Sequence, residues 1–139
     1  MKKLIAISLL LTLVLSLAGC AGGVDMDQAD KDIEAFFQAV AAGDFTAAQS
    51  LIHPSVTEDM QTFFDDLEKQ NAALDFQNGL TWEREMNIHY SWYHSDVGGS
   101  QYIRSFRLKA GDVTLRAEIT IVSNNAGYGI YSLYIQPTA

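Results

Sequence analysis

Cysteine is almost absent from this 139-residue sequence, which contains a single one at position 20. One cysteine cannot form an intramolecular disulfide, and it excludes the paired-cysteine motifs of zinc and redox sites. The three histidines, His53, His89 and His94, lack the close spacing of a metal-binding motif. We therefore expect neither a metal site nor a cofactor.

Positive charge is also scarce, with 9 Lys and Arg against 17 Asp and Glu and a formal net charge of −8. Between residues 25 and 75 only Lys31 and Lys69 oppose a long series of acids. Such a segment repels phosphate backbones and anionic lipid headgroups, so we expect no nucleic acid partner. The simplest interpretation is a solvated acidic face that keeps the domain soluble and off the membrane surface.

Long apolar runs are missing except near the start, where residues 4–18 are almost entirely apolar and follow Lys2 and Lys3. The run is shorter than the roughly 20 residues of a membrane-spanning helix, which favours a secretory signal. It ends in Leu17-Ala18-Gly19-Cys20, which resembles a bacterial lipobox. The resemblance implies that residues 1–19 are removed and that Cys20 is lipidated.

A lipid on Cys20 would hold the protein on the extracytoplasmic side of the cell membrane, without crossing it. Residues 20–26 would form a short tether, and residues 27–137 have the length of one compact domain. The alternative is a plain signal peptide that happens to contain a cysteine.

Apolar residues recur every three or four positions in the first half of this domain, which predicts helices. The first helix starts near Asp27 and ends at Gly43, and Asp44 caps a short second helix that stops before Pro54. The pattern Ser55-Val56-Thr57-Glu58 is typical of a capping box and predicts a third helix from this point.

After Asn78-Gly79 the apolar period changes to two, which predicts strands separated by short turns. We expect strands at 82–94, 101–109, 113–121 and 128–136. The fold class is therefore α+β, with N-terminal helices packed on a curved antiparallel sheet of about four strands.

This order of elements resembles the nuclear transport factor 2-like superfamily, and more narrowly the small bacterial lipoproteins of unknown function that carry such a domain. The residues behind the resemblance are Phe36-Phe37, Gly43-Asp44-Phe45, Ala47-Ala48 and the closing stretch 127–133. The resemblance implies a cone-shaped pocket between helices and sheet. Members use it for isomerase or cyclase chemistry, for binding or for dimerisation, so the fold leaves the function open.

Arg104 is the residue that breaks its local pattern, because it has inward parity between Tyr102 and Phe106. A buried charge needs a partner, so we expect an anionic or partly apolar small ligand near Arg104, with Tyr90, Trp92 and Tyr102 as walls. Three alternatives remain: the side chain reaches a rim, it pairs with an acid on a helix, or a bulge shifts the parity.

No Asp or Glu falls on the inward face predicted for the strands at 82–94, 101–109 and 113–121, so we expect no catalytic residue. The last strand is apolar on both predicted faces, so either it is covered on both sides or its outer face meets a partner, for which a second copy of the chain in a homodimer is one candidate. The sequence thus predicts a membrane-anchored envelope lipoprotein that is a non-catalytic ligand-binding or interaction module. The alternatives are an isomerase- or cyclase-type pocket enzyme, and a scaffold that contacts envelope proteins through the sheet face.

Overall fold

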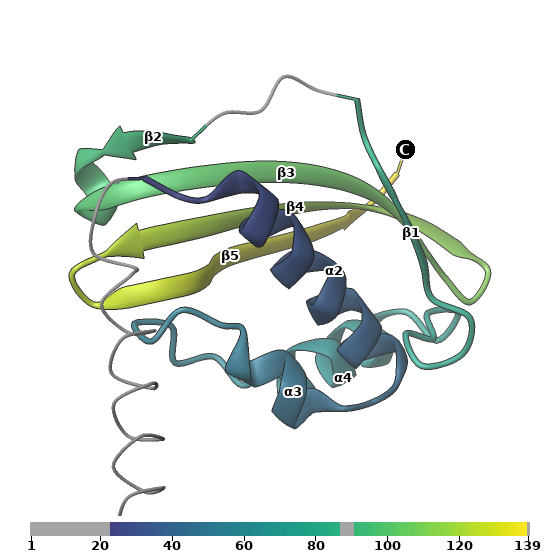
Figure 1. Cartoon of the computed structure of the whole chain (residues 1–139). Coiled ribbons are helices and arrows are strands. Elements are labelled where there is room, and N and C mark those ends of the chain that lie inside the picture. The colour runs from purple at the N-terminus through teal and green to yellow at the C-terminus, as the bar shows by residue number, and fades with distance from the viewer. Residues whose placement is uncertain (1–22, 87–90, 139) are drawn as a thin grey trace, which may run out of the picture.

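The computed structural model describes residues 23–86 and 91–138 and confirms the α+β class, with the helices preceding the sheet (Figure 1). The predicted signal segment, Cys20 and Tyr90 lie outside these residues. The elements are α2 (Met26–Ala41), α3 (Phe45–Ser50), α4 (Met60–Gln70), β1 (Thr81–Arg84), β2 (Ser91–His94), the 3-10 turn η2 (Ser95–Val97), β3 (Gly99–Ala110), β4 (Val113–Asn124) and β5 (Gly127–Pro137).

The strands form one antiparallel sheet in the order β1-β3-β4-β5, and β2 also pairs with β3. The three helices lie on one face of this curved sheet, with α2 crossing the long strands (Figure 1). Residues 102, 104, 106 and 108 of β3 and 115, 117, 119 and 121 of β4 are buried, as the alternating pattern predicts. These positions form the floor of the core.

The connections between the first two helices follow the sequence prediction. Asp25 caps α2 through the backbone N–H of Gln28, and Asp44 caps α3 through the N–H of Ala47. Gly43 has a φ of +70°, a left-handed value that glycine adopts without the cost of a Cβ contact. These local signals are sufficient to end one helix and start the next.

The predicted start of the third helix at Ser55 is wrong. The helix starts at Met60, and its cap is Asp59, which accepts from the N–H of Thr62. The preceding residues are held by β5 instead, because the N–H of His53 donates to the carbonyl of Ile130 at 2.8 Å. A long-range backbone pairing therefore overrides the local capping pattern.

The single strand predicted at 82–94 is also wrong, because β1 and β2 pair with β3 in different registers. Arg84 lies opposite Phe106 and Ser91 opposite Tyr102, so the register against β3 differs by three residues between β1 and β2. Because three is an odd number, residues with the same parity in β1 and β2 lie on opposite faces of the sheet. Trp82 pairs with Leu108 on the helix side, whereas Trp92 pairs with Gln101 and belongs to the outer face.

A β-bulge at Tyr131 corrects the faces predicted for the last strand. Ser132 lies opposite Thr120 but Ile130 lies opposite Ile121, so Tyr131 is the extra residue. The bulge places Leu133 on the same face as Ile130. The strand is therefore apolar on the helix side alone, and the argument for a dimer from two apolar faces no longer applies.

Candidate functional site

Arg104 and Asp30 form the centre of the candidate site. Arg104 Nε donates to Asp30 Oδ1 at 3.0 Å, and Nη2 donates to Oδ2 at 3.1 Å. The side chains of Arg104 and Asp30 are 6% and 16% exposed, so the pair is largely removed from water. Two parallel charge-assisted bonds are the strongest arrangement for this pair of groups. Of the three alternatives for Arg104, the structure shows pairing with a helix acid.

Two further donors reach the same carboxylate. The hydroxyl of Tyr102 donates to Asp30 Oδ1 at 2.9 Å, and Arg84 Nη1 lies 3.4 Å from Oδ2. Burial opposes ionisation of Asp30, but the bonds from Arg104 and Tyr102 and both guanidinium charges outweigh it, and the pKa falls below the usual 3.8. Burial, followed by the bond to Asp30, raises the pKa of Tyr102 to about 12.

Two other acids of α2, Asp32 and Glu34, also accept hydrogen bonds from the sheet. Tyr128 on β5 donates to Asp32 Oδ2 at 2.7 Å, and the indole N–H of Trp82 on β1 donates to Glu34. Burial and then the bond to Asp32 raise the pKa of Tyr128. These acids thus hold α2 against strands at both sides of the sheet.

Aromatic rings occupy the space between the helices and the sheet. Phe37 stacks on Trp82 at 5.5 Å between ring centroids and meets Phe106 edge-on at 5.1 Å. Phe64 of α4 lies 6.1 Å from Phe36 and 4.8 Å from Phe76. The rings pack in offset and edge-to-face geometries like those of other protein cores. Every buried side-chain nitrogen and oxygen in the described part of the chain has a hydrogen-bond partner.

The predicted site residues are only partly brought together. Tyr102 and Arg104 share the Asp30 carboxylate, while Trp92 belongs to the opposite face of the sheet, and Tyr90 is not among the described residues. Sequence reasoning missed Asp30 as the partner. A signal was present, because Asp30 precedes Ile33 and Phe37 by three and seven residues and therefore shares their helix face.

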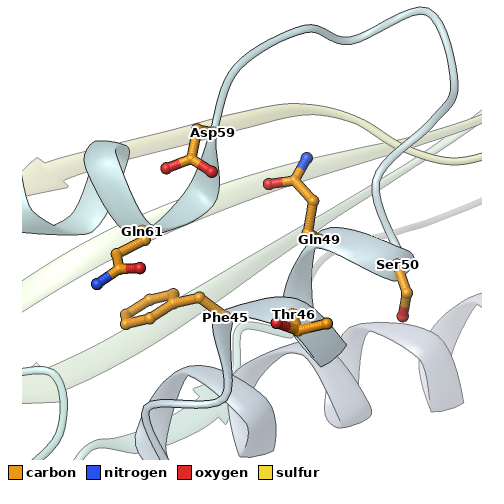
Figure 2. Close-up of a pocket in the computed structure, with 6 residues that line it drawn as sticks. All are labelled: Phe45, Thr46, Gln49, Ser50, Asp59 and Gln61. Atoms are coloured by element: carbon orange, nitrogen blue, oxygen red, sulfur yellow. The ribbon is translucent and has the colours of Figure 1, made fainter.

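A surface hollow of about 410 Å³ lies between α3 and the start of α4. Figure 2 shows the residues that line it: Phe45, Thr46, Gln49, Ser50, Asp59 and Gln61. Its polar groups already serve the backbone. Gln49 accepts from the N–H of Met60 and donates to the carbonyl of Glu58, and Asp59 caps α4. This hollow is therefore a consequence of how α4 begins.

A second hollow, of about 340 Å³, lies between the end of α4 and the sheet. Apolar residues from the region of α4 and from strands β4 and β5 line it: Leu67, Leu74, Leu115, Ile135 and Pro137. Two side-chain amides, those of Gln70 and Asn71, complete the lining. Neither hollow includes Asp30, Tyr102 or Arg104. Neither of these two hollows is therefore at the place where the sequence predicts a ligand beside Arg104.

The histidines that the structure describes have structural partners. His53 is fully buried and accepts from the N–H of Ser55, and its other ring nitrogen lies 3.1 Å from Asn124 Oδ1. His94 accepts from the N–H of Asp96 at the start of η2. Among residues 23–86 and 91–138, no group of three or more His, Cys, Asp or Glu could hold a metal ion.

Within the same residues no helix is both long and apolar enough to cross a membrane. Comparison with known proteins gives no match to any family model, curated protein or solved structure. The interpretation of the site therefore depends on the geometry of this chain alone.

Proposed function

We propose that the mature chain is a lipid-anchored cell-envelope protein, held by Cys20, that acts as a non-catalytic interaction module through the outer face of its sheet. The observation that carries the proposal is that the interior around Arg104 is filled. Aromatic rings occupy the space between helices and sheet, and Asp30 supplies the counter-charge that a ligand of Arg104 would otherwise provide. The helices followed by a curved sheet also support the resemblance to the nuclear transport factor 2-like superfamily.

The outer face of the sheet offers the chemistry for a protein contact. Three cations are exposed there: Arg107, Lys109 and Arg116. Tyr134 on the same face is 60% exposed. Tyrosine and arginine are enriched in protein interfaces. Glu83 and Glu118 lie on the same outer face and Arg116 pairs with Glu85, so this face carries mixed charge, whereas the helical layer on the other face is acidic.

Asp30 is a carboxylate on the helix side of the sheet, the feature that an isomerase- or cyclase-type pocket enzyme would need. A general base works best with a pKa near the operating pH, whereas the pKa of Asp30 is lowered. Both of its oxygens also accept bonds from Arg104. These properties suit a structural anion better than a base, so we rank the enzyme below the interaction module.

A small apolar ligand is the second candidate, and the hollow between α4 and the sheet favours it. Four of its lining residues are aliphatic, and the volume of about 340 Å³ is at the small end of ligand pockets. The amides of Gln70 and Asn71 would orient a polar end. This placement moves the ligand away from Arg104.

Photo-cross-linking on intact cells tests the proposal. The full chain carries a photoreactive amino acid at Tyr134 on the outer sheet face, or at Gln38, an exposed position on α2, as the matched control. Cross-links to another envelope protein from position 134 but not from position 38 support the interaction module. Cross-links from 134 to a second copy alone would instead make the face a homodimer contact.

Anchoring is tested separately by incorporation of labelled palmitate. The full chain should take up the label and fractionate with membranes, whereas Cys20→Ser should do neither. Unchanged labelling of Cys20→Ser would contradict the lipoprotein assignment.

A further inference from the structure

The first described residues, just before α2, are attached to one end of the sheet. Val24 is only 6% exposed, and its N–H donates to Ser91 Oγ of β2 at 3.0 Å. Only two residues later α2 starts at Met26. The start of the domain is therefore fixed beside β2, at the end of the sheet where β3 begins (Figure 1).

Two large apolar side chains are exposed beside this attachment. Met26 follows Val24 by two residues and is 41% exposed, and Tyr93 follows Ser91 by two residues and is 70% exposed. Both Ser91 and Tyr93 have the helix-side parity of β2, because they pair with Tyr102 and Ser100. Met26 and Tyr93 thus each lie two residues along the chain from a partner in the Val24–Ser91 hydrogen bond.

The distance to the lipid is short. Four peptide units join Cys20 to Val24, and even fully extended they reach about 14 Å. We propose that this end of the domain rests on the bilayer, with Met26 and Tyr93 in the headgroup region. The inference depends on the lipid anchoring of the proposed function and adds the orientation of the domain.

The chemistry of the two side chains fits the membrane interface. Tyrosine is enriched there because its ring is apolar and its hydroxyl remains hydrated. Two such contacts are too weak to hold a free protein, but an anchor this close gives an effective concentration on the order of millimolar. Exposed Asp25, Asp27 and Asp96 lie at the same end, so the surface suits zwitterionic headgroups and is repelled by anionic ones.

The orientation also decides which surface is available to partners. β3 has 12 residues and runs about 36 Å away from this end, so Arg107 and Lys109 lie far from the bilayer. The second hollow includes Leu115 and Pro137, which lie at that far end as well. The outer face near these residues is therefore presented to other envelope proteins.

The test uses the full chain purified from membranes and reconstituted in phosphatidylcholine vesicles. Met26→Cys, Tyr93→Cys and Lys109→Cys each carry a thiol-linked environment-sensitive fluorophore, and Lys109 is the distal control. Wild type should not label, because lipidation converts the Cys20 thiol to a thioether. Emission from positions 26 and 93 should shift to shorter wavelength and be lost with headgroup-labelled quencher lipids, while position 109 stays unchanged.

The outcomes distinguish a failure of the lipid anchor from a failure of the proposed orientation. Labelling of wild type shows a free Cys20, which overturns the lipid anchor and the orientation with it. Unlabelled wild type with equal, unquenched emission at all three positions overturns the orientation alone. Phosphatidylglycerol added to the vesicles should reduce the quenching at 26 and 93, and stronger quenching there would contradict the repulsion by Asp25, Asp27 and Asp96.

Discussion

Arg104 of β3 and Asp30 of α2, which are 74 residues apart, form a two-point ion pair between the helical layer and the sheet. The pair lies on the helix side of the sheet, where an unpaired guanidinium would cost several kcal/mol. Its role is therefore to fix how α2 lies across the strands. The same residue that suggests a ligand in the sequence is a structural residue in the fold.

Asp30→Asn should lower the free energy of unfolding by about 3 kcal/mol, because it leaves the charge of Arg104 buried without a counter-charge. Asp27→Asn is the matched control, since Asp27 is an exposed acid in the first turn of the same helix and should cost only about 0.5 kcal/mol. Urea unfolding followed by tryptophan fluorescence measures both. Equal effects of the two variants would contradict a structural role for Asp30.

Arg104→Gln combined with Asp30→Asn should be less damaging than the sum of the single variants. The second change removes the charge that the first leaves unpaired, so we expect a coupling of about 1–3 kcal/mol. A double-mutant cycle by urea unfolding gives this value. Additive losses would show that the two groups do not depend on each other, which the distances of 3.0 and 3.1 Å argue against.

The contribution of Asp30 to stability should vanish in acid. The native pKa is lowered from 3.8, so the ionised carboxylate stabilises the fold above that pH, and the stabilisation is lost as the pH falls through the native pKa. The difference in unfolding free energy between wild type and Asp30→Asn should thus be constant near neutral pH and shrink below pH 3.8. A difference that grows in acid would reverse the sign of the proposed shift.

Gly129→Ala should be more destabilising than Gly79→Ala. Both glycines have a left-handed or mirror-image φ, of +154° and +81°, so each substitution costs about 1 kcal/mol in backbone strain. A Cβ on Gly129 would also lie 2.7 Å from the backbone nitrogen of His53, whereas nothing lies within 4 Å at Gly79. Thermal unfolding of the two variants should give the lower midpoint for Gly129→Ala, and equal midpoints would argue against the close approach of β5 and the His53 segment.

The elements that follow from local chemistry were predictable. Asp25, Gly43 and Asp44 act through backbone groups within a few residues, and the alternation in β3 and β4 assigns their buried faces directly. A local signal that failed is the capping box at Ser55. It failed because the backbone of His53 is bonded to Ile130.

The remaining features depend on partners that are distant in the chain. The offset between β1 and β2 is defined only by their shared pairing with β3, and the bulge at Tyr131 only by the register with β4. An odd number of extra residues, three between β1 and β2 and one at Tyr131, reverses the later side chains, so Trp92 and Leu133 change faces without any change in the period-two pattern.

The pairing of Arg104 with Asp30 also depends on a partner that is distant in the chain. Periodicity predicts that Arg104 faces inward and that Asp30 lies on the apolar side of its helix, because both are properties of a single element. Whether the two meet depends on how α2 crosses the sheet, and the packing of Phe37 against Trp82 and Phe106 contributes to that arrangement together with the ion pair. Local sequence thus predicts the helices and long strands and the buried faces of α2, β3 and β4, while strand offsets, the bulge and the contacts between layers arise only when the elements pack.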